Sequence, residues 1–208
     1  MTKHFRRTWN GSRRNIKIPA FRRKTVTWLP QLGDIFPNFT ATSTLGELSF
    51  WDWAEGSWVY LFSHPEAFAS DCSLELTEFE ERSALFAESN VRMLAISGSN
   101  MAKQTAWHEY LAQFGCELSF PVIPDETLSL ARSFGMHHKN EASELPIRRS
   151  FIIGPNLKIR VITDRPSVIR RNPDDVLQTI EILQQHEQSI DGDSLGCLYD
   201  RKHEHEYA

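Results

Sequence analysis

Cys72 is the residue whose type and position best suit covalent chemistry. It follows the apolar stretch 57–62 and precedes an acidic segment that contains Glu75, Glu78, Glu80 and Glu81. Such a cysteine stands where a buried strand ends and a helix begins. Free peptide N–H groups at a helix start stabilise the thiolate, which is the nucleophilic form of cysteine. A thiol pKa lowered from ~8.5 toward 6 would leave most of the sulfur ionised at neutral pH. The alternative is an inert, buried cysteine.

Hydrophobic periodicity predicts the strands and helices that must position this cysteine. We expect strands at 57–62 and 91–97, helices at 72–89, 101–114, 126–134 and 172–185, and a hairpin of strands 148–153 and 158–162. A further short edge strand is expected at 25–28. Right-handed crossovers make the first two long strands parallel, whereas a hairpin is antiparallel. The expected fold class is therefore α/β, a thioredoxin-like three-layer fold with a mixed β-sheet flanked by helices.

Charge is divided unevenly along the 208 residues, although the net charge is only -4. The first 33 residues hold nine Lys or Arg and no Asp or Glu, while the remainder holds 14 basic and 27 acidic side chains. We therefore predict a basic, disordered arm at 1–28, one α/β domain at 29–186 and a polar tail at 187–208. The arm fits a solvated tail, a contact for an anionic partner or an organelle-targeting segment, and the sequence does not choose among them.

Several classes of protein are excluded by composition. No uncharged apolar run is long enough to span a bilayer, and no signal-peptide pattern occurs. The three cysteines, Cys72, Cys116 and Cys197, share no CxxC spacing, which argues against a disulfide scaffold, a zinc ribbon and a disulfide oxidoreductase. The histidine pairs at 137–138 and 203/205 are typical of exposed side chains, so no metal or cofactor is expected. The expected compartment is cytoplasmic, with organelle targeting by the arm as the alternative.

The segment from Ser63 to Cys72 resembles the active-site loop of peroxiredoxins, the AhpC/TSA family, whose pattern is Pro, three residues, Thr or Ser, two residues, Cys. Segments 50–58 and 61–65 look most like the one-cysteine branch that contains peroxiredoxin 6. Glu75 matches the family's Cys-x-x-Glu, and 120–125 resembles its Phe-Pro-x-x-x-Asp segment. Arg148, three residues before 151–155, falls where the family places an active-site arginine. The resemblance covers about residues 30–185.

The resemblance implies a thiol-dependent peroxidase that reduces hydrogen peroxide or alkyl hydroperoxides. Cys72 would be the peroxidatic cysteine, forming a sulfenic acid that an external thiol such as thioredoxin or glutathione reduces. Arg148 would stabilise the thiolate, Glu75 would orient the arginine and Pro65 would shield the sulfur from water. The remaining candidate pocket residues are His64, Phe68 and Ser70. The family also implies a homodimer or higher homo-oligomer. From the composition, neither a membrane nor a nucleic-acid partner is expected.

Two residues depart from the family pattern. The usual Thr or Ser is Ala69, which has no hydroxyl to hydrogen-bond the thiolate, and Asp71 places a carboxylate beside the thiol or caps the helix. Losing one charge-assisted hydrogen bond costs about 1.5–3 kcal/mol, or roughly ten- to hundredfold in rate. A degenerate, non-catalytic redox sensor or interaction protein is therefore the alternative. Cys197 is the candidate resolving cysteine, and Cys116 is expected to pack.

Overall fold

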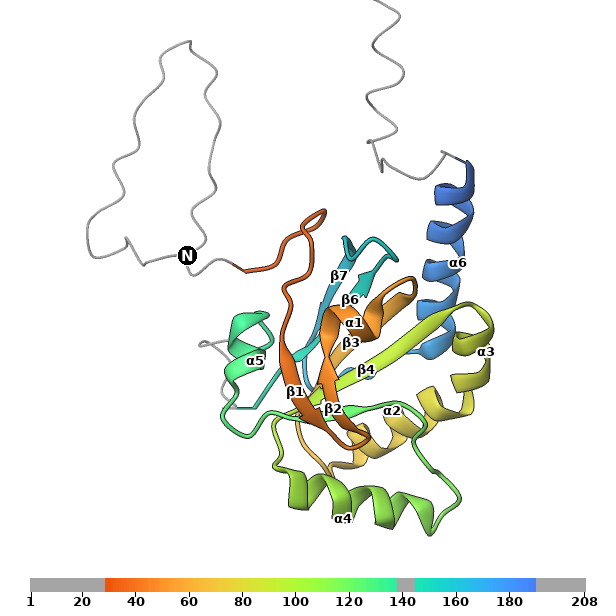
Figure 1. Cartoon of the computed structure of the whole chain (residues 1–208). Coiled ribbons are helices and arrows are strands. Elements are labelled where there is room, and N and C mark those ends of the chain that lie inside the picture. Colours follow the sequence, from red (N-terminus) through yellow and green to blue (C-terminus); the bar gives the residue numbers. More distant parts are fainter. Residues whose placement is uncertain (1–28, 138–144, 190–208) are drawn as a thin grey trace, which may run out of the picture.

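A five-stranded mixed sheet forms the centre of the computed structural model, which describes residues 29–137 and 145–189 (Figure 1). The spatial order of its strands is β5-β4-β3-β6-β7. β3 pairs in parallel with β4, β4 pairs in parallel with β5, and β6 is antiparallel to both β3 and β7. The strands are β3 (Trp58–His64), β4 (Val91–Ser97), β5 (Val122–Pro124), β6 (Arg148–Ile153) and β7 (Ile159–Arg165). The predicted mixed sheet, with two parallel strands and an antiparallel hairpin, is confirmed.

The remaining elements cover the two faces of this sheet. A two-stranded hairpin, β1 (Thr40–Ser43) with β2 (Gly46–Ser49), leads directly into α1 (Phe50–Ala54). The other helices are α2 (Ser70–Glu81), α3 (Ser83–Glu88), α4 (Met101–Ala112), α5 (Ser129–Ser133) and α6 (Pro173–Ser189). Asn100 caps α4 by accepting a hydrogen bond from the backbone N–H of Lys103 at 2.9 Å.

β3 is the core of the molecule because all seven of its residues are buried. Since side chains of a strand alternate between faces, Tyr60 and Phe62 belong to one apolar cluster and Val59 and Leu61 to another. The first cluster takes in residues of α2, α3, α4 and α6, and the second takes in residues of β2, α1 and α5. The molecule is therefore the predicted three-layer, thioredoxin-like fold, and Cys72 belongs to the first cluster.

Element boundaries are where sequence-based prediction was wrong. The helix expected at 72–89 is two helices, α2 and α3, separated at Arg82, and it begins at Ser70 rather than at the cysteine. The helix expected at 126–134 shrinks to α5, because Leu128 adopts a left-handed conformation at φ 56°. The short β1, β2, α1 and β5 were not expected at all, since their apolar residues are too few to show a period.

Both ends of the chain extend beyond the described residues. The strand expected at 25–28, the basic arm at 1–28 and the tail after 189 lie outside them. α6 runs to Ser189, three residues past the expected end of the domain at 186. The proposed domain boundaries therefore stay predictions.

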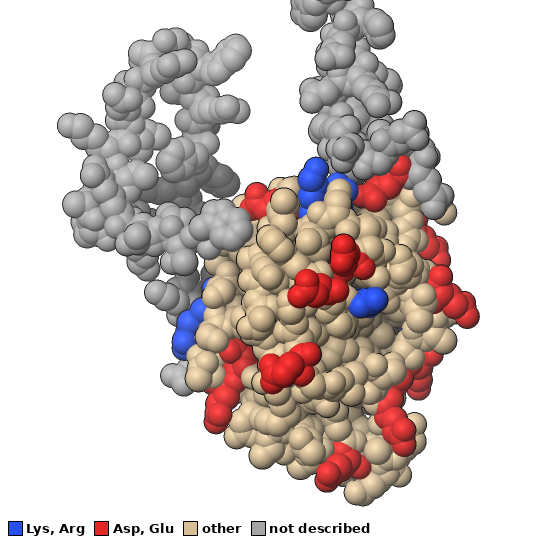
Figure 2. All heavy atoms as spheres, in the orientation of Figure 1, with Lys and Arg blue, Asp and Glu red and all other residues tan. Residues whose placement is uncertain are grey.

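Negative charge prevails on the described surface. Residues 29–137 and 145–189 carry 20 acidic and 11 basic side chains, and Figure 2 shows carboxylates spread over the face seen in Figure 1. Within those residues, no helix has the length and apolar character to cross a membrane, and no group of three or more metal-binding side chains is placed to hold an ion.

Phe36 is expected to be a main contributor to the stability of the second apolar cluster, the one that contains Val59 and Leu61. Its side chain is fully buried, and its ring lies 5.1 Å from Phe50, 4.8 Å from Phe134 and 5.2 Å from Phe151 between centroids. Phe36→Ala should lower the free energy of unfolding by about 3–5 kcal/mol in urea denaturation. Leu32→Ala, a truncation of a side chain that is 67% exposed, should change it by less than ~0.5 kcal/mol. Equal losses in the two variants would contradict this account of the core.

Candidate active site

Cys72 is the third residue of α2, at the end of the loop that leaves β3 at His64. Its side chain is fully buried in the cluster beneath the sheet face. Ala69 occupies the N-cap position of α2 and provides no side-chain hydrogen bond to the helix start. The structure therefore confirms the predicted strand-to-helix position of the cysteine.

Glu75 is held between two arginines one turn further along α2. Its carboxylate accepts hydrogen bonds from Arg148 Nη1 at 2.5 Å and from Arg171 Nη2 at 2.7 Å, both on Oε2. The other oxygen, Oε1, accepts from the backbone N–H of Arg171 at 2.7 Å and from its Nε at 3.0 Å. All three side chains are nearly inaccessible to solvent. One buried carboxylate therefore joins α2 to β6 and to the segment before α6.

Arg148 carries this network to the sulfur. Its Nη2 lies 3.6 Å from Cys72 Sγ, and its Nε donates to the carbonyl oxygen of Ser167 at 2.7 Å. Arg148 is the first residue of β6, and the antiparallel pairing of β6 with β3 brings it to the end of β3 where the active-site loop begins. The predicted neighbourhood of Cys72, Glu75 and Arg148 is thus present in the structure. The guanidinium places a fixed positive charge where negative charge would develop on sulfur.

Burial dominates the ionisation of Cys72. Burial raises the pKa of the thiol, while the backbone N–H of Glu66 and the charge of Arg148 lower it, and the net direction is upward. The carboxylate whose charge raises the pKa of Cys72 further is Glu75. The side chain of Asp71, the neighbouring carboxylate in the sequence, is exposed to solvent. The net direction is therefore opposite to the lowering that a helix start alone would favour, because desolvation outweighs the favourable contacts. Neither is Asp71 the cap of α2, since it lies within the first turn.

His64 closes the apolar side of the site. Its side chain is fully buried, and its ring centroid lies 5.4 Å from that of Trp107. Burial lowers its pKa to about 3, and the charges of Arg171 and Arg148 act in the same direction. The imidazole is therefore neutral at physiological pH and adds no charge beside the sulfur.

The other candidate residues of the loop between β3 and α2 differ in their exposure to solvent. Pro65 is buried, as expected of a residue that shields the thiol. Phe68 is 47% exposed at φ 66°, and its ring faces Trp107 and Tyr110 at 6.5 and 5.8 Å. Ser70 is exposed at the first position of α2. The parts that Phe68 and Ser70 play in a substrate pocket stay predictions.

Ser73 is a hydroxyl close to the cysteine that sequence reasoning did not consider. Its Oγ donates to the carbonyl oxygen of Ala69 at 3.1 Å and accepts from Trp107 Nε1 at 3.1 Å. The one hydroxyl proton is thus used within the helix start. Ser73 therefore does not replace the hydroxyl that Ala69 lacks.

Arg171 is the functional candidate that the sequence reading missed. Besides Glu75, its Nη2 binds the carbonyl oxygen of Ser63 at 2.8 Å, and its guanidinium lies over the ring of Phe62 at 4.9 Å. The signal available in the sequence was the arginine pair Arg170-Arg171 directly before the helix start at Pro173. That pair has no distinctive spacing from Cys72, because about a hundred residues separate them.

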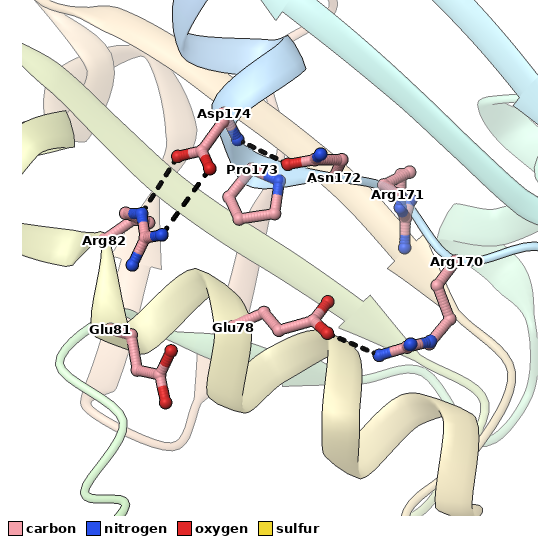
Figure 3. A pocket seen from close by; sticks show the side chains of 8 residues that line it. All are labelled: Glu78, Glu81, Arg82, Arg170, Arg171, Asn172, Pro173 and Asp174. Carbon is pink, nitrogen blue, oxygen red and sulfur yellow. Dashed lines mark hydrogen bonds and ion pairs between the residues drawn. The ribbon is translucent and has the colours of Figure 1, made fainter.

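A charged cavity of about 380 Å³ is lined in part by Arg171 (Figure 3). Two ion pairs cross its lining, Arg170 with Glu78 at 2.6 Å and Arg82 with Asp174 at 2.9 Å. Cys72 and Arg148 do not line it. The cavity is thus separate from the cysteine site, although the two share Arg171.

The remaining candidates divide between structural roles and the undescribed tail. Asp125 accepts from the backbone N–H groups of Ser129 at 2.8 Å and Ala131 at 2.7 Å, so it stabilises the start of α5. Cys116 packs in the core, as expected, and burial raises its pKa. Cys197 lies outside the described residues, and its resolving role stays a prediction.

Removing the charge of Glu75 should destabilise the protein more than any surface ion pair does. Glu75→Gln leaves two buried guanidinium groups without a counter-charge, and we expect the free energy of unfolding at pH 7 to fall by about 3–5 kcal/mol. Glu78→Gln is the matched control, because its partner Arg170 is partly exposed and such pairs contribute about 0–1 kcal/mol. Urea denaturation measures both variants. Equal losses would contradict the structural role of the Glu75 network.

Lowering the pH should remove the stabilisation that the Glu75 network with Arg148 and Arg171 provides. Burial alone would raise the pKa of Glu75, but Arg171 and then Arg148 lower it below its ordinary value of 4.5. A carboxylate with a lowered pKa stabilises the folded state above its ordinary pKa, and that stabilisation is lost as the pH falls through the lowered value. The loss of stability of the wild-type protein below about pH 4.5 should therefore be smaller in Glu75→Gln.

Comparisons with known proteins agree with this arrangement. The AhpC/TSA family model matches residues 32–162. Human peroxiredoxin-6 is 35% identical over 162 residues, 74% of this chain and 72% of the human protein, and a peroxiredoxin of Aquifex aeolicus is 32% identical over 160 residues, 76% and 72% of the two chains. The crystal structure of a mutant of the peroxiredoxin 6 of Arenicola marina has a TM-score of 0.71 at 35% identity, covering 76% of this chain and 75% of that one. With its cysteine, glutamate and arginine brought together on this fold, the chain belongs to the AhpC/TSA family of peroxiredoxins.

Proposed function

We propose that this protein is a thiol peroxidase that reduces hydrogen peroxide or alkyl hydroperoxides through Cys72. Membership of the peroxiredoxin family supports a thiol peroxidase role. The observation that carries the proposal for Cys72 is the position of its sulfur, 3.6 Å from Arg148 Nη2 at the start of a helix. Only the thiolate attacks peroxide efficiently, and a guanidinium at this distance stabilises it.

The proposed reaction transfers one oxygen atom to sulfur. The Cys72 thiolate attacks one peroxide oxygen, an S–O bond forms as the O–O bond breaks, and the departing oxygen takes a proton to leave as water or an alcohol. Arg148, with donors directed at the sulfur, stabilises the negative charge as it moves to the leaving oxygen. Glu75 fixes the guanidinium in place and Pro65 keeps water from the thiol. The product on the protein is a cysteine sulfenic acid.

An external thiol is the proposed reductant. It attacks the sulfenic sulfur, releases water and forms a mixed disulfide, which a second thiol then breaks to regenerate Cys72. A solved structure of a yeast mitochondrial one-cysteine peroxiredoxin, which concerns thiol resolution through the glutathione and thioredoxin systems, has a TM-score of 0.71 at 29% identity and covers 77% of this chain. This likeness supports thioredoxin or glutathione as the class of reductant. Resolution by Cys197 is the alternative.

We further propose that the protein acts as a homodimer or a higher homo-oligomer. Phe68, Tyr110 and Phe114 expose aromatic rings that contact one another in sequence, at 5.8 and 5.0 Å between centroids. Contiguous exposed aromatic side chains are typical of protein interfaces. A cytoplasmic location and a targeting role for the basic arm stay predictions, because the arm lies outside the described residues.

Stopped-flow reaction of the reduced protein with limiting hydrogen peroxide tests the peroxidase proposal. We expect a reaction well above that of a free thiol, with the gain of one oxygen atom in the intact mass and no reaction in Cys72→Ser. Because the pKa of Cys72 is raised, the rate constant should increase about tenfold per pH unit between pH 7 and 9 as thiolate forms. A rate equal to that of a free thiol at the same thiolate fraction would overturn the proposal. A loss of two hydrogens instead would identify Cys197 or Cys116 as resolving.

A non-catalytic redox sensor is the second candidate, and two observations favour it. Ala69 removes a hydroxyl from the loop, and burial raises the pKa of Cys72. Ala69→Thr separates the candidates, because a restored hydroxyl should increase the peroxide rate constant of a catalytic site by roughly ten- to hundredfold. Ala102→Thr, the same change at an exposed position of α4, is the control. An inert wild type that Ala69→Thr leaves inert would favour the non-catalytic alternative, a redox sensor or an interaction protein, over the peroxidase.

A further inference from the structure

The active-site loop joins the end of β3 at His64 to the helix that carries Cys72. Position 69 offers no hydroxyl, and the hydroxyl of Ser73 is directed to a carbonyl oxygen. Among the interactions that lower the pKa of Cys72, the hydrogen bond from the backbone N–H of Glu66 stands before the charge of Arg148. The orientation of this one peptide group therefore bears directly on the sulfur. A loop peptide keeps its orientation only if the residues on both sides of it are held.

The turn between β4 and α4 holds both neighbours of Glu66. The backbone N–H of Gly98 donates to the carbonyl oxygen of Pro65 at 3.2 Å, which fixes the peptide group that carries the Glu66 N–H. The backbone N–H of Ala67 donates to Ser99 Oγ at 2.9 Å, and both residues are buried. These two contacts therefore hold the residues on either side of Glu66.

A third contact reaches the side chain of Glu66 from α4. Lys103 Nζ lies 2.8 Å from Glu66 Oε2, and the two side chains are 42% and 39% exposed. Such an exposed pair adds little energy, but it acts on the same residue as the two backbone contacts.

The turn is itself rigid enough to serve as a support. Ser97 ends β4 and pairs in register with His64 at the end of β3, so the turn and the active-site loop leave the sheet side by side. The backbone N–H of Ser99 donates to Ser97 Oγ at 3.3 Å, and Asn100 caps α4. A Cβ atom at Gly98 would lie 2.9 Å from Pro65 O and 2.9 Å from Pro146 Cδ, so only glycine permits this close approach.

We propose that Ser99 is a positioning residue that, together with Gly98 and Lys103, fixes the active-site loop at Glu66 and thereby the surroundings of the Cys72 sulfur. The inference rests on the proposed function of Cys72. It adds that the Ser99 side chain keeps the loop around Glu66 in position. The hydrogen bonds of Ser99 go to Ala67 and Ser97 and not to Arg148, Glu75, Arg171 or His64, the charged and titratable groups near the sulfur. Its effect on the thiolate is therefore transmitted through the loop alone.

The test is the pH dependence of Cys72 alkylation by iodoacetamide, followed by intact mass, in the full-length protein. Ser99→Ala removes the acceptor for the Ala67 N–H and should move the midpoint of the alkylation profile upward by roughly half to one pH unit. Ser99→Thr keeps the hydroxyl and should restore the wild-type midpoint. Ser43→Ala is the matched control, because Ser43 is equally buried and its Oγ binds the carbonyl oxygen of Gly46 in the β1–β2 hairpin. It should leave the midpoint unchanged.

A midpoint in Ser99→Ala equal to that in Ser43→Ala would overturn the inference, and so would failure of Ser99→Thr to restore it. Should Ser99→Ala not fold, Lys103→Met decides, because that exposed side chain can be changed without disturbing the core. It should move the midpoint in the same direction by a smaller amount, and no shift would overturn the inference. Alkylation does not require peroxidase activity. An inert wild type in the peroxide assay would therefore refute the proposed function while the alkylation profiles still decide the role of Ser99.

Discussion

The carboxylate of Glu75, buried between Arg148 and Arg171, is the interaction on which the rest of the site depends. A charge without solvent is stable only with partners, and this one engages three separate parts of the chain: helix α2, strand β6 and the segment before α6. Those same parts define the walls around Cys72. Because the network is closed, the position of the guanidinium at the sulfur follows from the packing of the whole domain rather than from the flexibility of one side chain.

Burial of Cys72 works against its ionisation and in favour of its protection. The same apolar cluster that excludes water from the thiol raises its pKa, and the donors that remain must offset the loss of hydration. Arg148 and the Glu66 N–H provide that compensation in part. A neutral His64 keeps a further charge out of the site, since its burial holds it unprotonated. The chemistry is thus governed by a balance between desolvation and a few fixed donors.

Ala69 shifts that balance toward the backbone. Without a hydroxyl in the loop, the orientation of peptide groups carries more of the interaction with sulfur, and the neighbouring turn at Gly98 and Ser99 gains importance. The close approach at Gly98 shows how tightly the two loops are packed. The Cys72 sulfur still has the guanidinium of Arg148 beside it, at 3.6 Å from Nη2.

The sequence by itself determined the fold class and the strands 91–97 and 148–153, and its resemblance to peroxiredoxins implied that Glu75 and Arg148 accompany Cys72. Long apolar runs and a spaced motif are local properties, so they can be read without knowing the fold. Only the tertiary structure decided that Arg171 joins the site, that the expected helix 72–89 breaks at Arg82 and that the pKa of Cys72 is raised. A partner some hundred residues away leaves no periodic signal, and desolvation depends on which atoms from distant segments exclude water from the sulfur.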